Sequence, residues 1–346
     1  MVSITMNSLE RNTDNKRPTL ALVAKRAGVS KITASRALRD GTVVAPETRR
    51  RVEEAARALN YVPNRLAGTL AGATSFQIAV VLPSLSNIVF ADVLKGLETR
   101  LEDAGYHPIL GISHYDPERE EHLIRDLLSW RPAGLVLAPA RKSEGTRAML
   151  RSANVPVVEV MDVDAATADM AVGFSHREAG RSMAYYLSGR GYRRFGYVGH
   201  QISTDFRAVA RLDGFREGLD DAGAELVHTQ ILDGPSSVPL GREGLDRLLR
   251  TASTRPDAVF FSNDDMAVGG VFHCQAAGLS VPGDIALAGF NGLSIGQALP
   301  VPLTTIASNR ERIGLVAAET FLERLAGKVP QPIKRVEFKL LPGGTA

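Results

Sequence analysis

The region after Phe76 most constrains the fold, because short apolar runs alternate there with amphipathic stretches of about a dozen residues. Eight such runs predict strands, at 77–82, 108–112, 134–138, 155–160, 194–198, 226–232, 258–262 and 285–289. Helical stretches separate nearly all of them, and this alternation requires parallel sheets covered on both faces. We therefore expect an α/β body of two Rossmann-like lobes, with a cleft at the carboxyl ends of the strands.

The region before this body predicts a small all-α head. The expected helices cover 20–27, 31–38 and 46–59. Thr19 and Ser30 can cap the first two helices, Gly28 ends the first, and Pro46 suits the first turn of the third. Two helices joined by a turn that contains glycine are typical of a helix-turn-helix motif.

The expected domain boundaries follow these changes of pattern. Residues 1–18 are polar and lack the apolar stretch of a secretory signal, so we expect a disordered tail. Residues 19–63 are the expected head, 64–75 a linker or hinge helix, and 76–346 the two-lobed body. The stretch 65–72 contains two glycines and is too short to be helical by itself in water. Its order should therefore depend on what it contacts.

The charge is distributed unevenly along the chain, although the net charge is only +3. Residues 1–75 hold 13 lysines and arginines against 6 aspartates and glutamates, and the remainder is mildly acidic. A basic module of this size would release counterions on binding phosphates, which makes nucleic acid a natural partner. A solvated basic surface is the alternative, and charge alone does not separate the two.

Length and composition exclude several classes of protein. At 346 residues the chain is too long for a single ordinary domain, since a domain averages roughly 150 residues. No apolar run is long enough to span a bilayer, and Cys274 is the only cysteine, so neither an intrachain disulfide nor a cysteine-rich zinc site can form. We expect a cytoplasmic protein without metal or cofactor. Trp130, Tyr185, Tyr186 and Cys274 lie in apolar helical contexts and are expected in the core.

Several segments resemble the LacI family of repressors. The head carries VAKRAGVSKITASRAL at 23–38 and LNYVPN at 59–64, and the body carries SNDDMA at 262–267, VPGD at 281–284 and AGF at 288–290. The resemblance therefore covers nearly the whole chain. It implies a homodimeric, DNA-binding repressor with a bilobal body of the type I periplasmic-binding-protein kind, which binds effector and dimerises.

Other segments are most similar to the gluconate-operon repressors of that family. These segments are LPSLSN at 82–87, VMD at 160–162, AVGF at 171–174 and GFNG at 289–292. The resemblance implies a small sugar-acid effector such as gluconate, and the two heads of a dimer imply a palindromic operator. A neutral sugar, or an effector that acts as corepressor, stays open. An α/β enzyme is a remote alternative, because no GxGxxG, Walker, GxSxG or HExxH motif is present and no catalytic residue is expected.

The resemblance assigns DNA contacts to the head. Lys31, Ile32 and Arg36 occupy positions of the recognition helix that read bases, where arginine can pair with guanine and isoleucine can contact a thymine methyl. Phosphate contacts are expected from Thr19, Thr33, Ser35 and Asn64. For Thr19, simple helix capping is nearly as good an interpretation, and both roles can hold. Leu70 matches the leucine that the family inserts into the minor groove.

The resemblance also assigns an effector site between the lobes. The matching positions are Phe90, Asp162, Phe174, Arg211, Asn263 and Asn291, with Ser84, Asn87 and Arg207 as neighbours. A carboxylate and amides suit vicinal hydroxyls, an aromatic face suits sugar C–H groups, and arginine can bind an anion. Many family members carry aspartate where Asn291 stands. The neutral asparagine removes a negative charge that would repel a carboxylate, and this favours an acidic ligand. A local turn or helix capping is the alternative role for Asp162 and Asn263, and Asn263 could cap the helix that starts there.

Overall fold

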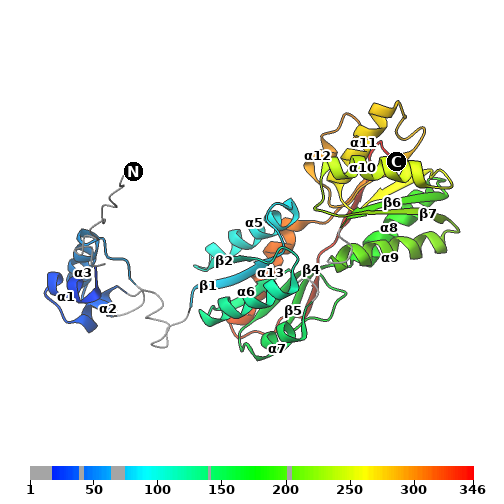
Figure 1. Ribbon diagram of the computed structural model, residues 1–346. Helices are drawn as coiled ribbons and strands as arrows, with labels where there is room; N and C mark the ends of the chain where they lie inside the picture. Colours follow the sequence, from blue (N-terminus) through cyan, green and yellow to red (C-terminus); the bar gives the residue numbers. More distant parts are fainter. Residues whose placement is uncertain (1–17, 39–42, 64–74, 139–141, 201–204) are drawn as a thin grey trace, which may run out of the picture. The chain divides into compact units, whose positions relative to one another are not determined.

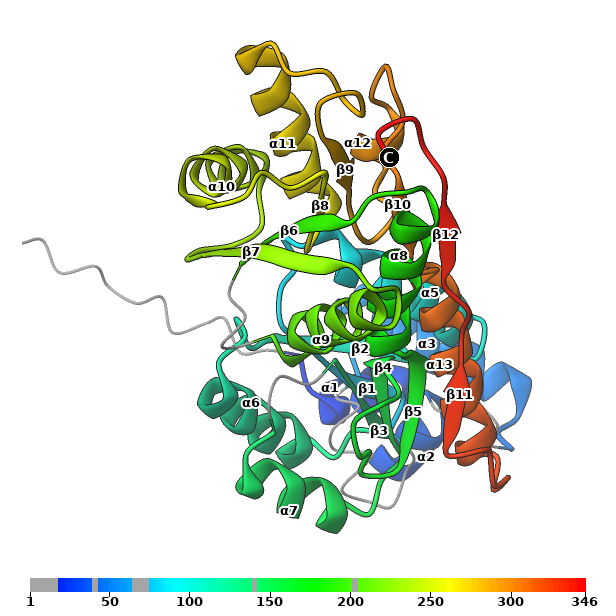
Figure 2. The ribbon, with the colours of Figure 1, turned by 90° about the vertical axis from the view of Figure 1, so that its right-hand side faces the viewer.

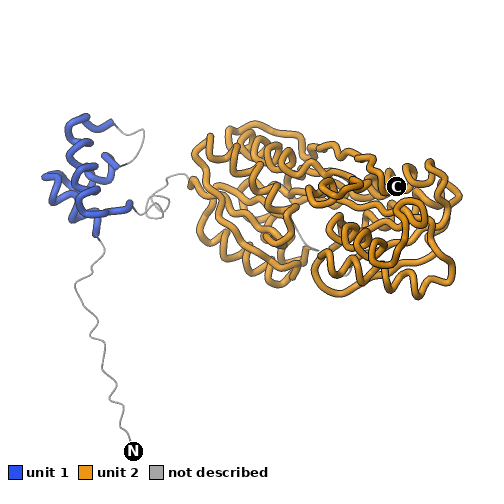
Figure 3. Tube along the Cα trace, turned by 90° about the horizontal axis from the view of Figure 1, so that it is seen from above, with its two compact units in different colours: residues 1–73 blue, residues 74–346 orange. Residues whose placement is uncertain are grey.

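The computed structural model describes residues 18–38, 43–63, 75–138, 142–200 and 205–346. The chain divides into two units, residues 1–73 and residues 74–346 (Figure 3). The expected tail over 1–18 and the expected linker over 64–75 lie almost wholly outside the described residues. Within the described residues no helix is both long and apolar enough to cross a membrane.

The described part of the head is helical, as predicted. Its helices are α1 Leu20–Ala27, α2 Lys31–Ala37 and α3 Pro46–Ala58. The Oγ1 of Thr19 and the Oγ of Ser30 accept hydrogen bonds from the first turns of α1 and α2, and Gly28 ends α1 in the left-handed conformation. The three helices bury a small core: Val23, Ala24, Ala27, Ala34, Ala37, Val52, Ala55 and Ala56. The predicted caps are therefore confirmed.

Lobe 1 is built on a six-stranded parallel sheet with the order β11-β5-β4-β3-β1-β2 (Figure 1). Its strands are β1 Gln77–Leu82, β2 His107–Ile112, β3 Gly134–Leu137, β4 Val157–Asp162, β5 Met170–Phe174 and β11 Ile333–Arg335. Its helices are α5 Ile88–Glu102, α6 Pro117–Ser129, α7 Glu144–Ser152 and α13 Arg310–Leu325. Because strand side chains alternate between faces, Val80 shares a core with Leu97 and Phe321, whereas Val81 shares one with Ile124.

Lobe 2 has a four-stranded parallel sheet with the order β7-β6-β8-β9 (Figure 2). Its strands are β6 Arg194–His200, β7 Glu225–Leu232, β8 Ala258–Phe261 and β9 Ala286–Ala288. Its helices are α8 His176–Gly189, α9 Phe206–Asp221, α10 Val238–Thr251, α11 Asp264–Ala277 and α12 Ser294–Gln297. Phe260 faces α8 and α9 through Met183 and Phe215, and Phe261 faces α10 through Leu245.

The chain passes between the lobes at β5 to α8, at β10 to α13 and at β11 to β12. The short strands β10 Thr305–Ala307 and β12 Lys339–Leu341 pair antiparallel. All eight strands predicted from the sequence are present, although β4 begins two residues later than predicted. β5, β10, β11 and β12 were not predicted. The last three are only three residues long, which is too short for an alternation of apolar and polar residues to be recognised in the sequence.

The prediction that Trp130 and Tyr185 belong to the core is wrong. Trp130 is 51% exposed at the end of α6, and Tyr185 is 46% exposed. The Tyr185 hydroxyl donates to Asp221 at 2.7 Å, so this ring lies on the surface between α8 and α9. Cys274, by contrast, is fully buried as predicted.

Candidate DNA and ligand sites

The exposed face of α2 carries the side chains predicted to read bases. Lys31, Ile32 and Arg36 are exposed, with Ile32 at 67%, whereas Ala34 and Ala37 are buried against the other helices. The helix therefore presents two cations and an apolar side chain on the face away from the head's core. This pattern suits major-groove contacts to guanine and thymine.

The hydroxyl groups near α2 are engaged in capping. The Oγ of Ser30 accepts from the Thr33 amide at 3.0 Å, and the two hydroxyls lie 2.8 Å apart. Thr19 accepts from the Leu22 amide at 3.3 Å and remains exposed, so capping leaves its outer face available to a phosphate. Ser35 is half-buried. Asn64 and Leu70 lie outside the described residues.

An arginine that the sequence analysis did not single out supports α2. Nη1 of Arg49, on α3, donates to the Ala37 carbonyl at 2.7 Å. This bond satisfies a carbonyl at the C-terminus of α2 and attaches the recognition face to the third helix. Its partner lies twelve residues away in the sequence, which is why no local pattern indicates it.

The side chains predicted for the effector site lie at the carboxyl ends of strands or on the helices that follow, as expected for a doubly wound sheet. Lobe 1 contributes Ser84, Asn87, Phe90, Asp162 and Phe174, and lobe 2 contributes Arg207, Arg211, Asn263 and Asn291. All are buried except Ser84 and Asn87, which are half-buried. Direct contacts join several of them.

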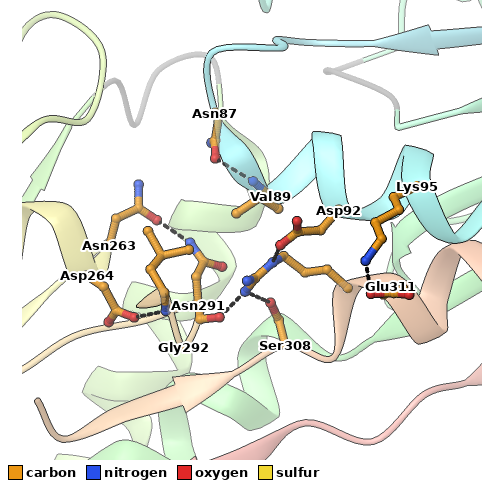
Figure 4. A network of polar contacts seen from close by, with 12 residues as sticks. Asn87, Val89, Asp92, Lys95, Asn263, Asp264, Asn291, Gly292, Ser308 and Glu311 are labelled. Atoms are coloured by element: carbon orange, nitrogen blue, oxygen red, sulfur yellow. Dashed lines mark hydrogen bonds and ion pairs between the residues drawn. The ribbon is translucent and has the colours of Figure 1, made fainter. Parts of the chain in front are cut away.

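Asn87 organises the start of α5 (Figure 4). Its Oδ1 accepts from the Val89 amide at 3.2 Å, and its Nδ2 lies 3.4 Å from the hydroxyl of Tyr115. The Tyr115 ring packs edge-on against Phe90, with ring centroids 6.4 Å apart. Burial, and then the nearby Asp205, raise the pKa of Tyr115. Its hydroxyl is therefore protonated at neutral pH and can donate to a ligand.

Arg207 spans the two lobes. Its Nε lies 3.3 Å from Oδ1 of Asp205 in lobe 2, and its guanidinium carbon lies 5.5 Å from the centre of the Phe90 ring in lobe 1. Burial alone would raise the pKa of Asp205, but the charges of Arg207 and Arg211 outweigh it and lower that pKa. Asp205 is therefore ionised, and it balances the charge of Arg207.

Arg211 has a different environment. It is 4% exposed, with its guanidinium carbon 4.3 Å above the centre of the Phe290 ring. Its Nη1 lies 2.9 Å from Nδ1 of His176, its Nη2 lies 3.5 Å from the Ser262 carbonyl, and its Nε has no hydrogen-bond partner among the described residues. Among those residues it makes no ion pair, although the nearby charge of Asp205 favours its cationic form.

The neutrality of His176 follows from its surroundings. Its Nε2 lies 2.9 Å from the Met161 carbonyl, which can only accept, so Nε2 carries the proton. Nδ1 then accepts from Arg211. Burial, followed by the charges of Arg211 and Arg207, holds the pKa of His176 well below its ordinary value. His176 was missed in the sequence analysis, as were Asp205 and Tyr115.

Asn263 and Asn291 form a buried amide pair (Figure 4). Nδ2 of Asn291 donates to Oδ1 of Asn263 at 2.7 Å. The alternative capping role of Asn263 is not supported, because its side chain makes no bond to the first turn of α11. Arg310 donates to the carbonyl of Asn291, and its Nε donates to Asp92 on α5 at 2.8 Å. This arginine therefore links the amide pair to lobe 1.

Asp162 and Phe174 lie side by side at the ends of β4 and β5. Oδ2 of Asp162 accepts from the Ala165 amide at 2.9 Å, which is the local turn role considered above, and burial raises the pKa of Asp162. The Phe174 ring is 2% exposed and packs 4.4 Å from the His176 ring and 6.2 Å from the Phe290 ring. Within the described residues, no group of three His, Cys, Asp or Glu side chains is placed to hold a metal ion.

Two family models match the chain. The model described as bacterial regulatory proteins, lacI family, matches residues 19–64, and the model described as periplasmic binding protein-like domain matches residues 184–346. The HTH-type transcriptional regulator GntR of Escherichia coli (strain K12) is 40% identical over 95% of this chain and 99% of its own length. GntR of Pseudomonas aeruginosa is 43% identical over 94% of each chain.

Solved structures agree with this relationship. A transcriptional regulator of the same family from Silicibacter pomeroyi superposes with a TM-score of 0.89 at 42% identity, over 95% of this chain and 99% of that one. The lac repressor dimer bound to operator and the anti-inducer ONPF superposes with a TM-score of 0.83 at 26% identity, over 95% of this chain and 99% of the repressor. Both the head and the two-lobed body are therefore shared with these proteins.

Proposed function

The chain belongs to the LacI family of bacterial regulatory proteins and is a DNA-binding transcription regulator, and we propose that a small sugar acid such as gluconate controls its affinity for operator DNA. The observation that carries this proposal is the buried cation of Arg211, whose direct contacts among the described residues are all neutral, and which shares the nearby charge of Asp205 with Arg207. A buried charge without an anion in direct contact is costly, and an anionic ligand would supply that contact. A carboxylate matches the fork of a guanidinium.

The other polar groups suit the hydroxyls of such a ligand. The amides of Asn87, Asn263 and Asn291 and the hydroxyl of Tyr115 offer donors and acceptors within one region. The Phe90 ring offers an apolar face, over which Arg207 already lies. Because Asn291 is neutral, it does not repel a carboxylate. These features favour a polyhydroxy acid over a neutral sugar.

We propose that the head binds DNA through α2 and that a homodimer reads a palindromic operator. Arg36 and Lys31 would bind guanine acceptors or phosphates, and Ile32 a thymine methyl. Thr19, Thr33, Ser35 and Asn64 would position the head on phosphates. The lac repressor of known structure is a dimer on its operator, and a two-fold dimer fits a two-fold site. The protein would then act in the cytoplasm, where the operator lies.

In this proposal residues 64–75 connect the head, 19–63, to the effector body, 76–346. The effector contacts both lobes, so it favours the lobe arrangement in which both sets of contacts are made. Only such differential affinity can shift the population of arrangements. The linker then changes the spacing or order of the two heads, and with it the affinity for the operator.

Titration calorimetry tests the effector class. Gluconate and related sugar acids are titrated into the purified protein beside neutral hexoses and pentoses, and we expect saturable binding of an acid only. An operator-binding assay with that acid then separates induction from corepression, because an inducer lowers the affinity for the operator and a corepressor raises it. Binding of neutral sugars alone would leave the regulator assignment intact and overturn the sugar-acid proposal.

The minor-groove role of Leu70 gives a prediction for the linker. Leu70→Ala is expected to weaken binding to an operator selected in vitro by about 10-fold or more, because an inserted leucine stabilises bent DNA. Binding to an unrelated duplex of the same length should hardly change, since it depends on phosphate contacts. Fluorescence anisotropy measures both. Val329→Ala, which alters an aliphatic side chain that is 86% exposed in the body, is the control. Equal losses on both duplexes would contradict the role.

A further inference from the structure

Three groups from different parts of the effector body form a continuous chain of hydrogen bonds. The Met161 carbonyl on β4 accepts a hydrogen bond from Nε2 of His176, and Nδ1 of His176 accepts one from Nη1 of Arg211 on α9. The donor–acceptor distance is 2.9 Å in both bonds. Met161 belongs to lobe 1 and Arg211 to lobe 2, whereas His176 begins α8 where the chain crosses between them. The chain of bonds therefore joins the two halves of the proposed effector site.

The backbone at Met161 is shaped for this contact. Met161 has φ +79°, a left-handed conformation that residues other than glycine rarely adopt. Its partner across the sheet is Gly173, where a Cβ would lie 2.6 Å from the carbonyl carbon of Met161. The glycine therefore permits the bend, which orients the Met161 carbonyl toward His176. Backbone conformations of this kind persist where the surroundings impose them, often at functional sites.

We propose that His176 is a positioning residue for the effector, holding the Arg211 guanidinium in the orientation that receives the ligand carboxylate. This inference rests on the proposed function. The Met161 carbonyl selects the tautomer with the proton on Nε2, which leaves the Nδ1 lone pair for Arg211. An arginine donor is thus fixed by a neutral acceptor, and its positive charge stays available. A carboxylate in place of His176 would orient the guanidinium equally well but would neutralise it.

The remaining contacts of Arg211 are too weak to fix its orientation. The Ser262 carbonyl lies 3.5 Å from Nη2, and the Phe290 ring restrains only the plane of the guanidinium. Nε has no partner among the described residues. Among the described residues, the His176 bond is therefore the strongest directional contact of this side chain. Without it, part of the free energy of effector binding would be spent on ordering Arg211.

The two ring nitrogens of His176 can be replaced separately. Asparagine places an acceptor where Nδ1 stands and keeps the bond to Arg211, whereas glutamine places a donor where Nε2 stands and keeps the bond to Met161. Phenylalanine keeps the ring volume without either bond. We expect His176→Gln and His176→Phe to weaken gluconate binding by about 10-fold or more, and His176→Asn by no more than about 3-fold.

Met183→Ala is the matched control, because Met183 is fully buried on the same helix and its apolar side chain forms none of the hydrogen bonds to Arg211 described above. It should lower the Tm and leave gluconate affinity within about 2-fold of wild type. Calorimetry gives the affinities and thermal unfolding gives the Tm of each variant. Equal losses for His176→Asn and His176→Gln, or a comparable loss for Met183→Ala, would overturn the positioning role.

A readout without effector separates this inference from the proposed function. In ¹⁵N-labelled protein without ligand, the guanidinium signals of Arg211 should be narrow and slow to exchange in wild type and in His176→Asn. They should broaden or disappear in His176→Gln and His176→Phe. Unchanged signals in His176→Phe would overturn the positioning role whatever the ligand. Failure of the wild type to bind gluconate or any sugar acid would overturn the proposed effector class instead.

Discussion

Arg211→Met is expected to weaken gluconate binding by about 30-fold or more, because truncating one partner of a buried, hydrogen-bonded charge pair costs about 2–5 kcal/mol. The methionine keeps the apolar stem that packs against Phe290. The ligand carboxylate would then be buried without a counter-charge. Calorimetry at neutral pH measures the change in affinity.

The control for Arg211 is Arg216, five residues further along α9. Arg216 has an exposed side chain whose only ion pair among the described residues is with Asp213, at 3.7 Å. Arg216→Met should leave gluconate affinity unchanged, since an exposed pair contributes little. Arg211→Met should also leave the Tm of the ligand-free protein nearly unchanged, because the cost of burying an unpaired charge offsets the lost hydrogen bonds. Wild-type affinity in Arg211→Met would refute the proposed ligand class.

Much of the architecture could be predicted because the relevant signals are local. The strand signal at 77–82 is a continuous apolar run, and the caps Thr19 and Ser30 act within three residues. Such features can be recognised from a short window of sequence. The strands β10 and β12 pair residues more than thirty positions apart over three residues each, so no window contains their signal.

The proposed effector site divides in the same way. Arg211 and Asn291 could be named from their resemblance to family motifs, but the sequence does not indicate what they contact. His176 follows a strand and begins a helix, so its sequence context is that of any polar residue at a helix start. Its importance comes from Met161 and Arg211, which lie 15 and 35 residues away. Only the folded chain brings these three together.

The same limit explains the erroneous core assignment of Trp130. Apolar neighbours in the sequence indicate that a residue is buried only as long as the helix continues and the residue lies on its inward face. α6 ends at Ser129, and Trp130 is its C-terminal cap, where the helix stops and the chain continues into β3. The residue therefore lies beyond the last buried position of the helix, Leu127. Hydrophobic character alone does not decide burial at a helix end.

Gly180→Ala is expected to lower the stability of the effector body by about 3 kcal/mol or more and its Tm by roughly 5–10 °C. Helices α8 and α9 pack with their backbones in contact, and a Cβ at Gly180 would lie 2.0 Å from the carbonyl oxygen of Arg211 and 2.9 Å from the amide of Phe215. Backbone atoms cannot rotate away as a side chain can, so the helices must separate. Thermal unfolding followed by circular dichroism measures the change.

The position of this contact couples stability to effector binding. The carbonyl that a Cβ at Gly180 would displace belongs to Arg211 itself, so the guanidinium moves with the helix and the bond to His176 lengthens. Gly180→Ala should therefore also weaken gluconate binding. Gly189→Ala on the same helix is the matched control, because a Cβ there meets no atom within 4 Å. That variant should be neutral or stabilise the protein by up to about 1 kcal/mol, since alanine favours helix. An unchanged Tm for Gly180→Ala would show that α8 and α9 can separate without cost, and would remove the reason for expecting weaker binding.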